Sequence, residues 1–160
     1  MALAPAIPAQ TRLREFTRAR ADLMRGAALT PKNMAAWYHL GLAHYFLGEF
    51  AESADAFRHS VETAPDNDER INSTNWLYAA LRRAGRAADA ARALEAIPPE
   101  MTNQAPHTRH YLNLIRFFQG KMSESGAPKA QEYFRRILKG RVWITWGFVG
   151  AETELLRKPK

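Results

Sequence analysis

The residues with the widest chemical repertoire in this sequence are its histidines, four of which form two pairs. His39 and His44 lie five residues apart, and His107 and His110 lie three apart. Two histidines on one helix could begin a metal site, but such a site needs further carboxylate, imidazole or thiolate ligands. The chain has no cysteine, and neither pair has a carboxylate at ligand spacing. We therefore predict no metal site and interpret these histidines as exposed or groove-lining.

Other catalytic arrangements are missing from the sequence. Gly120 and Lys121 resemble the end of a phosphate-binding loop, but Ile115 stands where that loop needs glycine, and Met122 where it needs serine or threonine. We find no Ser/His/Asp set, no acid pair at glycosidase-like spacing and no glycine-rich dinucleotide loop. The sequence thus predicts a protein that is not an enzyme and binds no cofactor.

The composition is that of one globular domain, with 160 residues of which 46% are apolar and 24% charged. The formal charge of +7 is unevenly distributed. Residues 1–33 carry six cations and two anions, residues 34–70 two and seven, residues 71–100 four and three, and residues 101–160 eleven and four. An acidic block between basic ends argues against a continuous track for phosphates, so a nucleic-acid partner is disfavoured. No apolar stretch reaches the ~20 residues of a membrane span.

The first nine residues predict a flexible tail, and residues 10–160 predict a single helical domain. Ala4-Pro5-Ala6 has the small-x-small form of a signal-peptide cleavage site, although the segment has no charged start. If the tail is the remnant of an export signal, the protein is periplasmic or secreted. Otherwise we expect it to be cytoplasmic.

Regularly spaced turn residues divide the rest of the chain into helices. Pro31 and Pro65 lie 34 residues apart, and Gly48, Gly85 and Gly120 follow each other at intervals of 37 and 35. Periods of this size are typical of helical repeats. The apolar periodicity between these residues predicts helices at 10–28, 34–47, 50–63, 68–84, 87–95, 106–119, 128–139 and 142–156.

The segment from Trp37 to Pro65 carries the most specific pattern. In order and spacing, its small, aromatic and turn residues resemble one complete tetratricopeptide repeat: Trp37, Leu40, Gly41, Ala43, Tyr45, Gly48, Phe50, Ala54, Phe57 and Pro65. Ser53 and Ser60 stand where the family has alanine, which keeps these side chains small. Weaker copies follow at residues 72–97 and 106–138. The resemblance implies an all-α fold, a right-handed α-solenoid of stacked antiparallel helix pairs, with about three repeats plus flanking helices.

In this family the first helix of each repeat lines a concave groove that binds proteins. The resemblance therefore implies a non-catalytic scaffold or adaptor that binds a peptide or a partner helix. The groove positions carried over to this chain are Ala35, Tyr38, Leu42, Tyr45, Asn72, Asn75, Arg82, His107, His110 and Phe117. Asparagine amides can pair with a peptide amide, and an arginine can bind a carboxylate. For Tyr45 and Phe117 the alternative is packing in the core between neighbouring helices.

Basic residues at the two ends of the chain suggest a second function. The first predicted helix carries five arginines: Arg12, Arg14, Arg18, Arg20 and Arg25. They suit a polar cap on the end of a solenoid. The alternative is a basic arm that binds nucleic acid or anionic surfaces together with the basic C-terminal third.

The C-terminal segment is both aromatic and basic. Trp143, Trp146 and Phe148 lie between Lys139 and the cations that end at Lys160. A final helix that covers the end of the solenoid explains this pattern. The alternative is a self-association surface that forms a homodimer.

A narrower resemblance involves two segments. Residues 65–78 and 111–120 resemble parts of periplasmic tetratricopeptide-repeat adaptors of the bacterial new-lipoprotein-I type, which tether proteases and cell-wall enzymes. This chain lacks the lipid-accepting cysteine of those adaptors. The resemblance therefore implies an adaptor and leaves lipid anchoring open.

Overall fold

The structure, a computed structural model, describes residues 9–120, and the regular elements in that range are helices. They are α1 (Ala9–Leu29), α2 (Met34–Leu47), α3 (Phe50–Glu62), α4 (Asn67–Arg83), α5 (Ala87–Ala93) and α6 (Arg109–Phe118), with short 3-10 turns η1 (Leu94–Ala96) and η2 (Pro106–Thr108). The helices predicted from residue 10 to residue 119 are confirmed, with ends displaced by a few residues. Those predicted at 128–139 and 142–156 lie outside the described residues.

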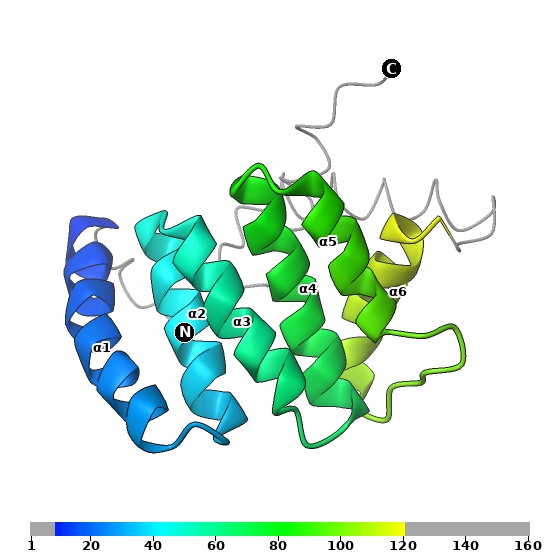
Figure 1. The fold of residues 1–160 in the computed structure, drawn as a ribbon, viewed down its shortest axis with the longest axis horizontal. Helices are drawn as coiled ribbons and strands as arrows, with labels where there is room; N and C mark the ends of the chain where they lie inside the picture. Colours follow the sequence, from blue (N-terminus) through cyan, green and yellow to red (C-terminus); the bar gives the residue numbers. More distant parts are fainter. Residues whose placement is uncertain (1–8, 121–160) are drawn as a thin grey trace, which may run out of the picture.

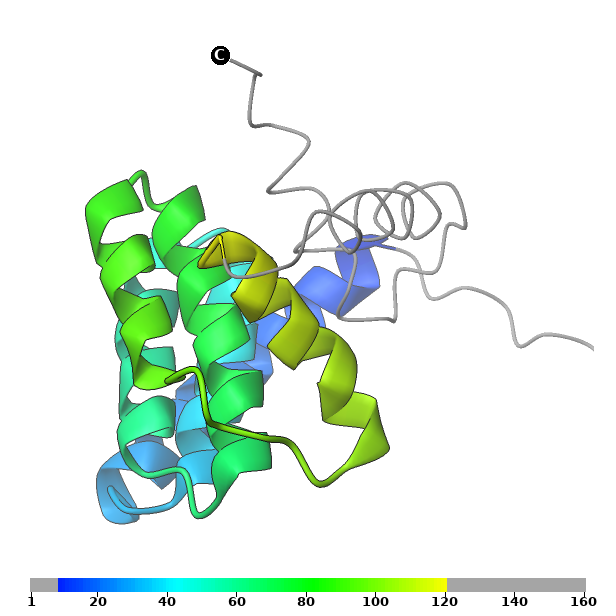
Figure 2. The same cartoon turned by 90° about the vertical axis from the view of Figure 1, so that its right-hand side faces the viewer.

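Consecutive helices stand side by side and pack in pairs, as the predicted helical solenoid requires (Figure 1). Helix α2 packs on α3, α3 on α4 and α4 on α5, while α6 packs on α4. Figure 2 shows that α6 and the first turns of α1 lie on the same side of the α2–α5 layers. We call the surface formed by α2, α4 and α6 on that side the inner face.

Local sequence signals set the helix ends. The side chains of Asn33 and Asp66 cap α2 and α4 by accepting hydrogen bonds from Ala36 N and Glu69 N. Gly48 ends α2 with a φ of 80°, a left-handed conformation that glycine adopts at low cost. Gly85 and Gly120 have φ values of 76° and 70°. The evenly spaced glycines therefore mark the ends of the inner helices.

The core is centred on a close approach between α2 and α3. A Cβ atom on Gly41 would lie 2.9 Å from atoms of the Phe57 ring. The Phe57 ring stacks on Trp76 of α4, with ring centroids 5.8 Å apart and an interplanar angle of 12°. Both aromatic side chains are buried. The missing side chain at residue 41 thus lets three helices share one aromatic contact.

Two buried serines stand where the repeat pattern has alanine, and both make hydrogen bonds. Ser53 Oγ donates to the carbonyl oxygen of Gly41 at 2.8 Å, which ties α3 to α2. The hydroxyls of Ser60 and Ser73 lie 2.8 Å apart and tie α3 to α4. A buried hydroxyl without a partner would destabilise the fold. These serines therefore add links between helices without adding volume.

Three polar side chains fix the chain between α5 and α6. Asp68 accepts hydrogen bonds from Gln104 N at 3.1 Å, Ala105 N at 3.2 Å and the Thr108 hydroxyl. Arg116 donates to the carbonyl oxygens of Pro98, Pro99 and Met101. Gln119 Nε2 donates to the carbonyl oxygens of Leu94 and Ile97 at 2.8 and 2.9 Å. The irregular connection is therefore held at both ends of α6, which sets the position of that helix.

Replacing Gly41 with alanine is expected to destabilise the protein by about 1–3 kcal/mol, the usual cost of overpacking a core. The added Cβ would press on the Phe57 ring, which cannot move away without breaking its stack on Trp76. The free energy of unfolding in urea measures this change.

Gly26→Ala is the matched control. Gly26 lies in α1, and no atom lies within 4 Å of the position of its Cβ. Because alanine favours helix over glycine, this variant is expected to gain up to about 1 kcal/mol. Equal effects of the two substitutions would contradict the close-approach interpretation.

Candidate functional site

The inner face has a polar pair at the point where α2 meets α4. The Tyr38 hydroxyl donates to Asn72 Oδ1 at 3.3 Å, and both side chains are half-buried. Burial raises the pKa of Tyr38 to about 12, although the hydrogen bonds with Asn72 and Trp76 act in the opposite direction. Tyr38 thus stays a neutral hydroxyl at physiological pH. Ala35, one turn before Tyr38 in α2, is exposed.

Beneath this pair the aromatic side chains close the core. Tyr45 is 7% exposed, and its ring meets Trp76 edge-on with centroids 5.2 Å apart. Leu42 is also buried. Tyr45 therefore lies in the core, the alternative that the sequence left open for it. Trp76 is not among the groove positions predicted from the sequence. It follows Leu42 by 34 residues, the same interval by which Asn72 follows Tyr38.

A second cluster lies between α4 and α6. The Tyr78 ring stacks on Phe118, with centroids 4.4 Å apart and an interplanar angle of 21°. Arg82 Nη1 donates to the Tyr78 hydroxyl at 3.4 Å, and its guanidinium lies 5.9 Å from the centre of the Tyr78 ring. Arg82 and Phe117 are half-buried. The structure therefore brings Arg82 to the α4–α6 side, together with Tyr78 and Phe118, which the sequence analysis did not single out.

The remaining predicted groove residues differ in exposure. Asn75 is 3% exposed, so its amide is enclosed. His110 is half-buried, and the centroid of its ring lies 3.8 Å from the centroid of the Tyr111 ring. His107 belongs to η2, and its side chain falls outside the described part of the structure. Trp143, Trp146 and Phe148, proposed for self-association, also lie outside the described residues.

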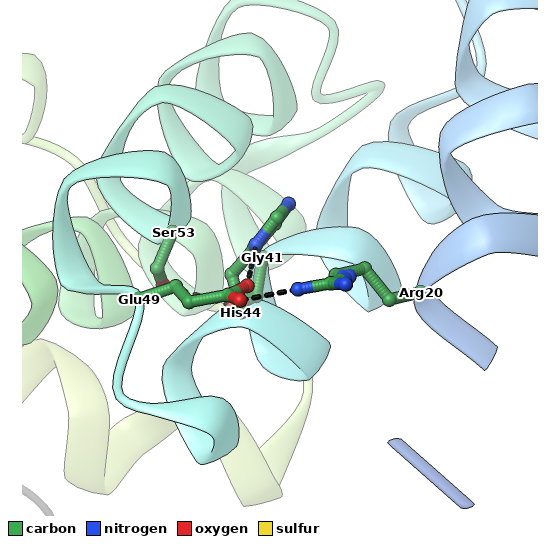
Figure 3. Close-up of polar contacts among 5 residues, drawn as sticks. All are labelled: Arg20, Gly41, His44, Glu49 and Ser53. Carbon is green, nitrogen blue, oxygen red and sulfur yellow. Dashed lines mark hydrogen bonds and ion pairs between the residues drawn. The ribbon is translucent and has the colours of Figure 1, made fainter. Parts of the chain in front are cut away.

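An ionic cluster joins α1 to the first repeat (Figure 3). Glu49, in the turn between α2 and α3, accepts a hydrogen bond from Arg20 of α1, and its other carboxylate oxygen lies 2.6 Å from Nδ1 of His44. Arg20 and then His44 hold the pKa of Glu49 below its ordinary value. Next to this cluster lies the Ser53 hydrogen bond to Gly41. One arginine of α1 thus binds α1 to the solenoid, as expected of a cap.

The described residues also bear on metal binding and on membrane insertion. Among the described residues, no group of three or more histidine, aspartate or glutamate side chains is placed to hold a metal ion. In the same part of the chain, no helix is long and apolar enough to cross a membrane.

Comparison with known proteins supports the repeat. A family model described as Tetratricopeptide repeat matches residues 34–67, which include α2, the turn at Gly48 and α3. Searches of curated proteins and of solved structures found no match. The narrower resemblance to adaptors of the new-lipoprotein-I type is not supported. The chain therefore contains a tetratricopeptide repeat within a helical solenoid, and such repeats generally act as scaffolds for protein interactions.

Acid is expected to weaken the link between Arg20 and Glu49. Because the pKa of Glu49 is lower in the folded state than its ordinary value of 4.5, the ionised carboxylate stabilises the fold above about pH 4.5. This contribution is lost as the pH falls through the lower pKa of the folded state. In urea unfolding, the stability difference between wild type and Glu49→Gln should therefore shrink between about pH 6 and about pH 3.

Glu52→Gln serves as the control, because Glu52 is an exposed acid on the neighbouring turn of α3. Its stability difference from wild type should change less over the same pH range. A constant difference for Glu49→Gln would show that the cluster does not stabilise the fold.

Proposed function

We propose that this chain is a non-catalytic scaffold that binds a peptide or a partner helix on its inner face, around Tyr38 and Asn72. The observation that carries the proposal is the polar pair itself. It bridges two inner helices, is partly exposed, and lies over a closed aromatic core. A surface of this kind presents fixed hydrogen-bonding groups beside apolar area, which suits recognition of a polypeptide.

The chemistry of the pair fits a peptide backbone. Asn72 accepts the Tyr38 hydroxyl at its amide oxygen, and its amide nitrogen carries two N–H donors. These donors can bind a carbonyl oxygen of an extended peptide or of a helix end. The exposed methyl of Ala35 leaves room beside the pair for the bound chain.

Arg82 supplies a second kind of contact. Its guanidinium is held against the Tyr78 ring, so less side-chain entropy is lost when it binds a partner. Guanidinium groups bind carboxylates through two parallel hydrogen bonds. An acidic residue in the partner is therefore expected to lie near the α4–α6 side of the inner face.

The arginines of α1 give less support to binding of anionic surfaces. Arg20 pairs with Glu49, and Arg25 lies 2.5 Å from the Asp22 carboxylate. Arg20 thus has a half-buried acidic partner within the fold, whereas the Arg25–Asp22 pair is exposed. The Arg20 contact supports a capping helix more than a basic arm.

A peptide selected on the wild-type chain from a random displayed library tests the proposal. Ala35→Glu and Tyr38→Ala are each expected to weaken its binding at least about tenfold, since both change the surface around the Tyr38–Asn72 pair. The dissociation constant measured by calorimetry reports the loss.

Ala51→Glu is the matched control, because Ala51 is also exposed but lies on α3 in the outer layer. It should leave the affinity unchanged. If Ala51→Glu weakens binding as much as Ala35→Glu, or if neither inner-face variant weakens it, the proposed binding face is wrong. Thermal unfolding of each variant separates loss of binding from loss of fold.

A further inference from the structure

A second surface lies at the edge of the inner face, between α1 and α2. This α1–α2 cleft has a volume of about 530 Å³ and is lined mainly by apolar side chains: Phe16, Ala19, Asp22, Leu23, His39, Leu42, Ala43 and Phe46. Its size is in the range of pockets that hold bulky side chains or small ligands. No residue of the Tyr38–Asn72 pair lines it.

The cleft exposes aromatic surface that water disfavours. Phe46 is 41% exposed, although its ring stacks on Phe16 with centroids 4.9 Å apart. Covering apolar surface is worth about 25 cal/mol for each Å² removed from water. An occupant with aromatic side chains would therefore be stabilised here.

The cleft has one carboxylate at its rim, although α1 as a whole is basic. The one formally charged residue among those that line the cleft is Asp22. Its partner is Arg25, and both side chains are more than 70% exposed. Exposed ion pairs contribute little, so a cation from another segment can compete for the Asp22 carboxylate.

The chain itself has a segment of this chemistry. Residues 139–160 hold five cations and two anions, and they include Trp143, Trp146 and Phe148. Aromatic residues between cations match an apolar cleft with one carboxylate at its rim.

The chain between α6 and Trp143 is long enough to reach the α1–α2 cleft. Residues 119–142 separate α6 from Trp143. A chain of this length spans about 36 Å even if it is entirely helical. Three steps of about 10 Å each between helix axes, from α6 through α4 and α2 to α1, cover about 30 Å. Figure 2 shows α6 and the first turns of α1 on the same side of the α2–α5 layers.

We propose that the Trp143–Phe148 segment binds in the α1–α2 cleft of the same chain. This proposal does not depend on peptide binding at Tyr38 and Asn72. The aromatic C-terminal segment would then bind within its own chain, at the edge of the inner face. This role replaces self-association between two chains.

Disulfide crosslinking in the full-length protein tests the proposal, because the natural sequence contains no cysteine. Ala19→Cys in the cleft is combined in turn with Ile144→Cys, Thr145→Cys and Gly147→Cys. A disulfide needs Cα atoms within about 7 Å. We expect at least one pair to form a bond within a single chain under mild oxidation, seen as a monomer of altered mobility on a non-reducing gel.

Ala88→Cys replaces Ala19→Cys in the matched control, because Ala88 is exposed on α5 in the outer layer. Its pairs should remain uncrosslinked. Equal crosslinking from Ala88, no crosslinking from Ala19, or bonds that join only two different chains would each overturn the proposal.

A second substitution tests the role of the cleft surface itself. Phe46→Asn in the crosslinking background should lower the yield about tenfold, since an occupant would then bury the unpaired polar atoms of an uncharged amide. Phe46→Leu keeps the surface apolar and should preserve the yield. An unchanged yield with Phe46→Asn, in a protein with native circular dichroism, would also overturn the proposal.

Discussion

The close approach of Gly41 to the Phe57 ring is the contact on which the rest of the solenoid depends. Because residue 41 has no Cβ, the ring occupies the space that a side chain would fill, and α3 lies directly against α2. The same ring also stacks on Trp76 and so fixes α4. Tyr45 then closes the group by meeting Trp76 edge-on. One glycine and three aromatic rings thus determine how three consecutive helices stack, and the inner face follows from that stacking.

Short polar contacts surround this aromatic centre and specify which helix surfaces meet. Ser53 and the Ser60–Ser73 pair connect α3 to the helices on both sides, in places where the repeat pattern has or tolerates small apolar residues. Each bond fits only one rotation of its helix, because the partner must lie within hydrogen-bonding distance. The hydrophobic contacts supply most of the stabilising free energy. The serines instead select a single arrangement among the packings that aromatic rings alone would allow.

Much of the fold could be predicted from the sequence because its signals are local. The glycines at positive φ, the caps at Asn33 and Asp66 and the pattern from Trp37 to Pro65 all act over a few residues or one repeat.

The register of α4 was harder to derive. Gly48 and Gly85 lie 37 residues apart, whereas Tyr38 and Asn72 meet at an interval of 34, because α4 has 17 residues and α2 has 14. The glycine interval of 37 residues, counted from Tyr38, leads to Asn75, whereas the observed partner is Asn72. The difference of three residues is the extra length of α4, which the glycine spacing does not reveal. The contacts of Asp68 and Arg116 were also beyond sequence reasoning, because they join residues brought together only by the fold.

Under the proposed function, the same packing links stability to recognition. Tyr38 and Asn72 belong to different helices, and their relative position is set by the aromatic contact beneath them rather than by a loop. A face built in this way loses little conformational entropy when a partner binds, since its groups are already in place. A partner that contacts both α2 and α4 binds the stacked state and not the separated one, so binding also stabilises the stacking. The residues best suited to recognition are therefore those at the surface of the α2–α4 contact, while the buried residues below them act on binding only through the position of the helices.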